Sequence, residues 1–112
     1  MLETTKHTRV TTEDKKEGEL APSVYKVKAL KGGKTLATIQ FQEGPMKEAE
    51  SNGIFHEDLL HIVKNRLHHF QDSPYASDEN ERALQHVSQA ILALNERTQN
   101  REARGVKGTS KI

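Results

Sequence analysis

Two stretches of apolar residues at helical spacing, separated by a short helix-breaking segment, constrain the fold of this chain most. The first stripe, with Leu60 and Ile62 beside it, consists of Leu59, Val63, Leu67 and Phe70. The second, with Ala83 and Ala90 as small neighbours, consists of Leu84, Val87, Ile91 and Leu94. Intervals of three and four residues place such side chains on one face of a helix. The link over residues 72–76 is short, so the two helices are expected to form an antiparallel hairpin.

The ends of both helices carry recognisable signals. We expect the first helix over residues 54–71 and the second over residues 78–104. Ser77 or Asp78 is placed to cap the second helix, because both side chains accept hydrogen bonds from free backbone N–H groups. Gly105 is a plausible stop after its last turn.

Residues 23–42 predict a β-hairpin, because apolar and polar residues alternate on either side of Lys31-Gly32-Gly33-Lys34. A two-residue Gly-Gly loop would pair residue 30 with residue 35. A loop one residue longer pairs 30 with 34 and places two apolar sets on one face, namely Tyr25, Val27 and Ala29 with Ala37, Ile39 and Phe41. We favour the longer loop, with a bulge at glycine, because one apolar face is then buried.

The remaining N-terminal segments carry weaker patterns. Residues 1–22 are polar and show no sustained hydrophobic period, which predicts a flexible arm. An arm that becomes ordered across a partner subunit is the alternative. Residues 43–53 form a connector, in which residues 46–50 could add a short edge strand.

The predicted class is α+β, with an N-terminal antiparallel β-hairpin or small sheet followed by a long antiparallel helical hairpin. We expect one domain over residues 23–112, comprising a β-hairpin region (23–50), the helical hairpin (54–104) and a basic tail (105–112). Only 33% of the 112 residues are hydrophobic and tryptophan is absent, so one copy can bury little apolar surface. Oligomerisation is the usual remedy where disulfides and metals are missing.

Composition also excludes several classes of protein. Cysteine is absent, which removes disulfides, thiolate nucleophiles and cysteine-based zinc sites. No apolar run approaches the roughly 20 residues that span a bilayer, and no apolar signal-peptide core is present, so no membrane association is expected. A formal net charge of +1 is low for a protein that coats DNA or RNA, and no DNA partner is expected.

Arg97, Arg101 and Arg104 are spaced so that they share one face of the second helix. At 1.5 Å per residue the second helix should be ~40 Å long and the first ~27 Å, so the arginines lie on an overhang. One interpretation is a solvated helix end, where the helix dipole favours cations. The other is an anion site, because guanidinium groups donate bidentate hydrogen bonds to phosphate oxygens. Glycines in the tail that follows would let backbone N–H groups approach the anion.

Catalytic and metal sites are not expected. His61 and His68 lie seven residues apart on one helical face, wider than the i, i+4 spacing typical of zinc ligands, and further ligands are not evident. No acid–base pair or phosphate loop is found. We therefore predict a protein that is not an enzyme and carries no cofactor.

Phe70 and Tyr75 flank the link between the helices, and Asn80 lies in the first turn of the second. The aromatic pair could close the hairpin as a core plug. It could instead offer a stacking platform for a nucleobase, with the amide of Asn80 contacting the edge of the base.

The C-terminal half of the chain resembles one family of proteins. The motifs that carry the resemblance are Asn52-Gly53, His56-Glu57-Asp58-Leu59-Leu60, Phe70-Gln71, Ser73-Pro74-Tyr75, Glu79-Asn80, Arg97-Thr98, Arg101-Glu102-Ala103-Arg104-Gly105-Val106 and Gly108-Thr109. They are similar to the phage sponge proteins that counter Thoeris defence (type one, Tad family), which share a helical hairpin with the anti-CBASS sponges. The likeness covers about residues 23–112. Phe55 departs from it, because a small polar cap is expected there in the family.

The resemblance implies a phage protein of the host bacterial cytoplasm that sequesters a cyclic ADP-ribose isomer without cleaving it. It also implies dimers that often assemble into hexamers, with CBASS cyclic di- or trinucleotides as possible second ligands. By the same resemblance Phe70 stacks on the adenine, Asn80 contacts the base or ribose, and Arg97 and Arg101 clamp the pyrophosphate. Arg104 and Thr109 are further nominations from the arginine-rich motif.

Helix geometry predicts that two chains build such a site. Asn80 and Arg97 are ~26 Å apart along one helix, too far for one small ligand to touch both. We therefore expect Phe70 and Asn80 from one subunit to meet the arginines of another. The alternative function is a small oligomeric nucleic-acid-binding regulatory phage protein, using the basic tail and Lys26, Lys28, Lys31 and Lys34.

Overall fold

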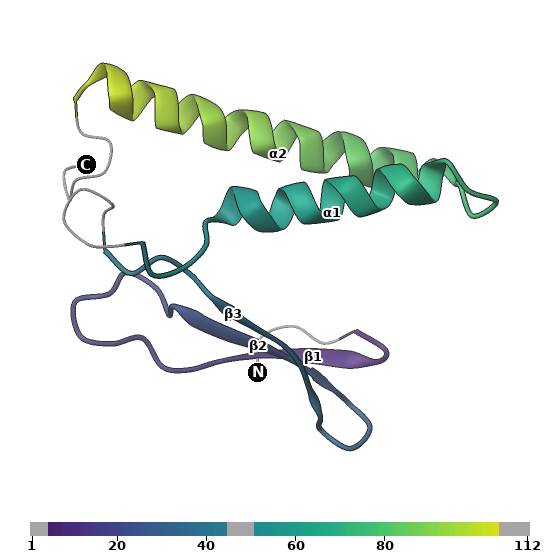
Figure 1. Ribbon diagram of the computed structural model, residues 1–112, viewed down its shortest axis with the longest axis horizontal. Helices are drawn as coiled ribbons and strands as arrows, with labels where there is room; N and C mark the ends of the chain where they lie inside the picture. The colour runs from purple at the N-terminus through teal and green to yellow at the C-terminus, as the bar shows by residue number, and fades with distance from the viewer. Residues whose placement is uncertain (1–4, 45–50, 106–112) are drawn as a thin grey trace. The chain divides into compact units, whose positions relative to one another are not determined.

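A computed structural model describes residues 5–44 and 51–105 of the chain, which fall into two units, Met1–Ile54 and Phe55–Ile112. The first unit holds three strands, β1 (Thr8–Thr12), β2 (Val24–Ala29) and β3 (Thr35–Gln40), in an antiparallel sheet of order β1-β2-β3 (Figure 1). The second unit holds two helices, α1 (His56–Gln71) and α2 (Asp78–Ala103). The α+β prediction, a small sheet followed by a helical hairpin, is confirmed.

The predicted register of the β2–β3 hairpin is confirmed over most of its length, because Tyr25 pairs with Ile39 and Val27 pairs with Ala37. The position of the bulge was predicted wrongly. The register shifts between Val27 and Lys28, which pairs with Thr35, so the extra residue lies within β3 and not at a glycine. Both glycines of the turn instead have positive φ angles, which let the chain reverse there without side-chain strain.

Strand β1 corrects the expectation that residues 1–22 form an arm without regular structure. Thr8–Thr12 pairs along its whole length with β2 of the same chain, with Val10 opposite Val27. The threonines of β1 have high β propensity, but Val10 is its one apolar residue, so no apolar alternation predicts the strand.

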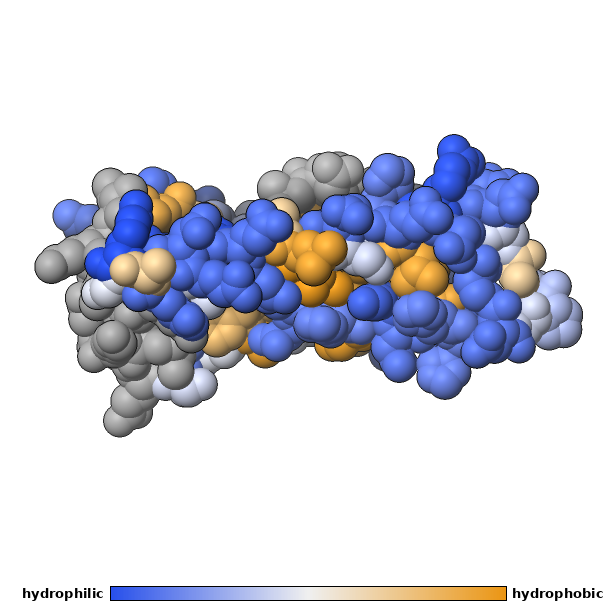
Figure 2. Space-filling model, turned by 90° about the horizontal axis from the view of Figure 1, so that it is seen from above, coloured by the Kyte–Doolittle hydropathy of each residue, from blue (hydrophilic) through white to orange (hydrophobic). Residues whose placement is uncertain are grey.

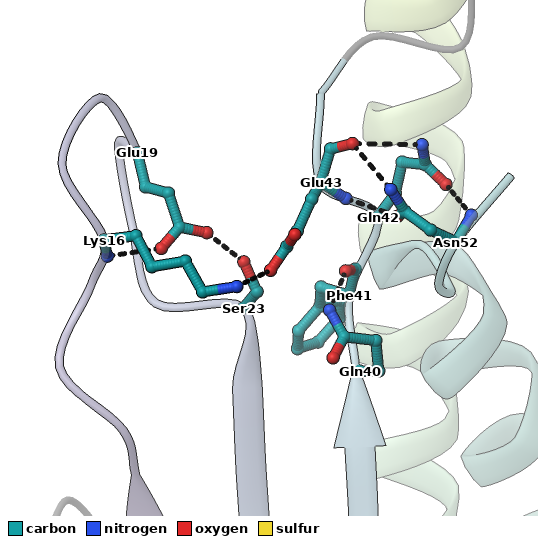
Figure 3. A network of polar contacts seen from close by, with 8 residues as sticks. All are labelled: Lys16, Glu19, Ser23, Gln40, Phe41, Gln42, Glu43 and Asn52. Carbon is teal, nitrogen blue, oxygen red and sulfur yellow. Dashed lines mark hydrogen bonds and ion pairs between the residues drawn. The ribbon is translucent and has the colours of Figure 1, made fainter. Parts of the chain in front are cut away.

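Polar contacts hold the connections of the sheet unit (Figure 3). Ser23, which is buried, donates from its hydroxyl to the carboxylate of Glu19. Lys16 donates from its backbone N–H to the same carboxylate at 2.5 Å and from Nζ to Glu43 at 3.0 Å. The loop between β1 and β2 is therefore tied to the chain that follows β3.

A second set of contacts closes the connector after β3. The side chain of Asn52 accepts from the Glu43 N–H at 2.7 Å and donates to the Glu43 carbonyl at 2.9 Å. Beyond it, Ile54 forms a parallel bridge with Phe41. The rings of Phe41 and Tyr25 meet edge-on, with 5.5 Å between their centroids. The strand expected over residues 46–50 lies outside the described residues.

Helix α1 begins two residues later than expected, because the backbone of Ile54 is hydrogen-bonded to Gln40 and Gln42 at the end of β3. Phe55, the unusual residue at the cap position, has no side-chain oxygen to accept a bond. Asp58 compensates, since its carboxylate accepts from the Phe55 N–H at 2.8 Å. Helix α2 is capped by Ser77, whose hydroxyl accepts from the Asn80 N–H at 3.0 Å, and Gly105 follows it with a φ of +72° as predicted.

The two helices pack against each other through a small core. Among the described residues the buried hydrophobic side chains are Leu84 and Ile91, both on α2. The expected stripe on α1 is only partly covered, because Leu59 and Leu67 are half-buried while Val63 is 45% exposed. One chain therefore leaves much of its apolar surface in water.

The difference in helix length is confirmed. α2 has 26 residues and α1 has 16, or ~39 Å against ~24 Å. Figure 1 shows α2 continuing beyond the beginning of α1. The overhang carries Arg97 and Arg101.

Candidate ligand-binding site

A hollow of about 480 Å³ lies where α1 meets the turn between the helices. Its floor and rim are formed by Ile62, Asn65, Arg66, His69, Phe70, Ser73 and Tyr75. Apolar and aromatic side chains with a few polar groups at the edge are typical of ligand sites. Figure 2, which looks onto the helices from above, shows hydrophobic patches within their otherwise hydrophilic surface.

Phe70 is the central aromatic residue of this hollow. The residue is 38% exposed, and the guanidinium carbon of Arg66 lies over its ring, 5.2 Å from the ring centroid. Tyr75 is 74% exposed, too open for the core plug that was one interpretation of the aromatic pair. The hydroxyl of Ser73 shapes the turn between them, donating to the Phe70 carbonyl at 2.5 Å and accepting from the Tyr75 N–H at 3.1 Å.

Asn80 lies in the first turn of α2 and is oriented by the turn before it. Its side-chain N–H donates to the carbonyl of Tyr75 at 3.3 Å. The amide therefore uses a donor within the chain, and its oxygen is the atom best placed to accept a hydrogen bond from a ligand.

The predicted arginines lie on the last turns of α2. Arg97 and Arg104 are exposed and Arg101 is half-buried. Arg101 and Arg104 each interact with another group of the chain. Thr98, between Arg97 and Arg101, donates its hydroxyl to the carbonyl of Leu94 at 3.2 Å. Thr109 lies outside the described residues.

One chain does not bring the two halves of the predicted site together. Phe70 and Asn80 lie at the turn of the hairpin, and the arginines lie towards the other end of α2 (Figure 1). The axial separation of Asn80 and Arg97 is ~26 Å at 1.5 Å per residue.

The sequence-based interpretation missed Arg66, the neighbour of Phe70 in the hollow. A signal was present, because Arg66 and Phe70 are four residues apart on one helix and such pairs meet on its surface. Asn65 and His69 were also not singled out for this hollow.

The part of the chain that the structure describes holds no cluster of three or more metal-ligating side chains. Over the same residues, neither helix has the length and apolar character of a membrane-spanning segment.

Comparison with known proteins identifies the family. The model of the Acb2/Tad1 hairpin domain matches residues 34–99, more than half of the chain. The chain belongs to this family. The matched range of the Acb2/Tad1 hairpin domain includes Phe70, Asn80 and Arg97, and ends before Arg101 and Arg104.

A relative within the same group is the Thoeris anti-defense 1 protein of Bacillus phage SBSphiJ7. The two are 46% identical over 74 residues, which is 66% of this chain. The alignment covers 52% of the relative, so the chain spans about half the length of that protein. The resemblance inferred from the sequence motifs is confirmed.

Proposed function

We propose that this member of the Acb2/Tad1 hairpin family is a phage anti-defence protein that acts as a sponge. It binds a cyclic ADP-ribose isomer, the signal of bacterial Thoeris immunity, and holds it intact in the host cytoplasm. The observation that carries the proposal is the 46% identity, over 74 residues, to a Thoeris anti-defense protein. The match of residues 34–99 to the Acb2/Tad1 hairpin domain supports it. Sequestration needs affinity and no bond cleavage, so the proposed protein is not an enzyme and uses no cofactor.

The chemistry of the candidate residues suits this ligand. A purine can stack on the exposed ring of Phe70. The Asn80 oxygen accepts from the exocyclic amine of an adenine or from a ribose hydroxyl. Arg97 and Arg101 pair with the pyrophosphate, where guanidinium groups bind bidentately. Arg104 and Thr109 support the same end of the ligand.

In the proposed assembly the site is completed by two chains. Phe70 and Asn80 of one subunit face the arginines of another, because the helix length separates them within one chain. A dimer is the smallest assembly that does this, and a hexamer of three dimers also would. CBASS cyclic di- and trinucleotides are proposed as ligands of a second site.

Calorimetry of the purified protein against cyclic ADP-ribose isomers, cyclic oligonucleotides and duplex DNA tests the function. We expect tight binding of one cyclic ADP-ribose isomer and recovery of that ligand intact after denaturation. Recovery of a cleaved product would contradict the sponge and indicate a hydrolase. Binding of DNA alone, with steep salt dependence, would indicate the nucleic-acid-binding alternative.

Arg97→Ala and Arg101→Ala test the pyrophosphate clamp. Each hydrogen bond to a charged group contributes about 1.5–3 kcal/mol, so each variant should bind about 10- to 150-fold more weakly. Light scattering should show an unchanged assembly. Arg82→Ala, which removes an exposed arginine elsewhere on α2, is the control and should bind normally. Unchanged affinity of the Arg97 and Arg101 variants would rule out the clamp.

A further inference from the structure

Arg66 occupies one face of the Phe70 ring, which limits how a base can stack there. Its guanidinium carbon is 5.2 Å from the ring centroid. A base inserted between the two would need van der Waals separation on both sides, or about 7 Å in all. The gap is too narrow, so a base must use the other ring face or push Arg66 away.

The direction of helical side chains indicates which face Arg66 covers. Long side chains on a helix lean towards its N-terminus, over the residues three and four positions earlier. Phe70 therefore leans over Arg66, and the guanidinium covers the ring face nearer the start of α1. The opposite face looks towards the turn, where Ser73 and Tyr75 line the same hollow.

A polar side chain that can contact the edge of a base is held at the same turn. The side-chain N–H of Asn80 donates to the Tyr75 carbonyl at 3.3 Å, which ties Asn80 to the turn whose Tyr75 lines the hollow. The apolar hollow continues there through Tyr75. We therefore expect a base to stack on the turn-side face and contact Asn80 at its edge without moving Arg66.

We propose that Arg66 is a positioning residue of the base subsite, whose guanidinium backs the Phe70 ring, fixes its plane and directs the base to the turn-side face. This inference rests on the proposed function, because it assumes a purine ligand. Arg66 itself touches the ring and not the ligand. An exposed cation–π contact of this kind is modest, so its loss should weaken ligand binding about two- to five-fold.

A double-mutant cycle between Arg66 and Phe70 tests the inference. Affinity for the cyclic ADP-ribose isomer is measured for the native chain, Arg66→Met, Phe70→Leu and the double variant. Arg66→Met keeps the long stem and removes the cation. We expect about two- to five-fold weaker binding in the native background and no further effect of Arg66→Met in the Phe70→Leu background. Arg66→Lys should restore part of the loss.

Each other outcome has a defined meaning. An equal loss in both backgrounds would show that Arg66 contacts the ligand directly and would overturn the inference. Tighter binding of Arg66→Met would show that Arg66 blocks the face the base uses, and would overturn it too. If the native chain binds no cyclic ADP-ribose isomer, both the proposed function and this inference are wrong. If the native chain binds and Arg66→Met binds equally, only this inference fails.

An independent measurement uses the protein without ligand. The side-chain protons of Arg66 should show upfield NMR shifts from the Phe70 ring current, and Phe70→Leu should remove them. Random-coil shifts in the native chain would show that the guanidinium does not rest on the ring, and would overturn the inference whatever the protein binds.

Discussion

Hydrogen bonds from neighbouring groups lower the pKa of two half-buried acids in the sheet unit. The pKa of Glu19 is lowered, first by the hydrogen bond from the Ser23 hydroxyl and next by the Lys16 backbone N–H. The pKa of Glu43 is lowered mainly by the hydrogen bond from Lys16 Nζ. The same bond raises the pKa of Lys16. Each of the three groups is therefore held in its charged form by a named partner.

The directions of these three pKa shifts determine how the stability of the sheet unit changes with pH. A carboxyl group with a lowered pKa contributes stability above its ordinary value of 4.5, and the contribution is lost as pH falls through the lowered pKa. The raised pKa of Lys16 has the opposite effect, so its contribution is present below 10.5 and is lost as pH rises through the raised pKa. These contacts should support the sheet unit across neutral pH and weaken in acid.

Replacing Lys16 by methionine distinguishes the cause of the lowered pKa of Glu43 from that of Glu19. Lys16→Met removes the donor to Glu43 but leaves the Ser23 hydroxyl and the backbone N–H that bind Glu19. The titration midpoint of Glu43, followed by carbon-13 NMR of its carboxyl group, should rise towards 4.5. The midpoint of Glu19 should change little. Lys15→Met, at the neighbouring lysine, is the control, and an equal effect there would contradict the assignment.

At the level of secondary structure, the joint between Phe41 and Ile54 holds the end of the sheet unit. The Ile54 N–H donates to the Gln40 carbonyl at 2.8 Å, and the Gln42 N–H donates to the Ile54 carbonyl at 2.9 Å. Gly53 makes this approach possible. A Cβ atom at that position would lie 2.5 Å from the Phe41 oxygen and 2.7 Å from the Gln40 oxygen, and would also collide with the Phe41 carbonyl carbon.

Gly53→Ala should therefore open this joint. Backbone atoms cannot rotate away as a flexible side chain can, so we expect a destabilisation of about 1–3 kcal/mol, typical of overpacking. Hydrogen exchange should accelerate at the amides of Gln42 and Ile54. Ser51→Ala, at an exposed position two residues earlier, should leave exchange at both amides unchanged. Native exchange rates in Gly53→Ala would show that the chain has room there.

How well the sequence predicts each helix or strand depends on how regularly its apolar residues are spaced. Both helices follow from apolar spacing to within two residues, and the β2–β3 register follows from matching two apolar faces. β1 could not be predicted in this way, because Val10 is its one apolar residue. Ser77 and Asp78 were equal candidates for the cap, and local geometry selects Ser77.

At the level of the whole molecule, the small hydrophobic core and the distance between the two groups of site residues both predict self-association. Two buried side chains, Leu84 and Ile91, make up the hydrophobic core of the described residues. Val63 and Ile62 stay 45% and 62% exposed on α1, and Leu92 stays 53% exposed on α2. A second chain that covered such surfaces would also bring its own arginines. Self-association is thus a prediction of both packing and function.

Complementation between two weakened variants tests the shared site. Phe70→Ala and Arg97→Ala should each bind much more weakly than the native chain, since each removes one half of every site. When the two are mixed, unfolded and refolded together, mixed assemblies should contain some sites with both halves intact. Calorimetry should then recover part of the native binding capacity at native affinity. No recovery, despite mixed assemblies seen by native mass spectrometry, would place all the site residues on one chain.

The sequence by itself determined the helical hairpin, the overhang of α2 and the family, because these depend on residue spacing and on short motifs along the chain. It also nominated Phe70, Asn80, Arg97 and Arg101, whose roles in binding stay predictions. The tertiary structure decided what depends on contacts between distant segments. It paired β1 with β2, placed Gly53 against Phe41, and left Val63 and Tyr75 exposed. It also set Arg66 on the ring of Phe70, a contact that requires two particular rotamers as well as favourable spacing.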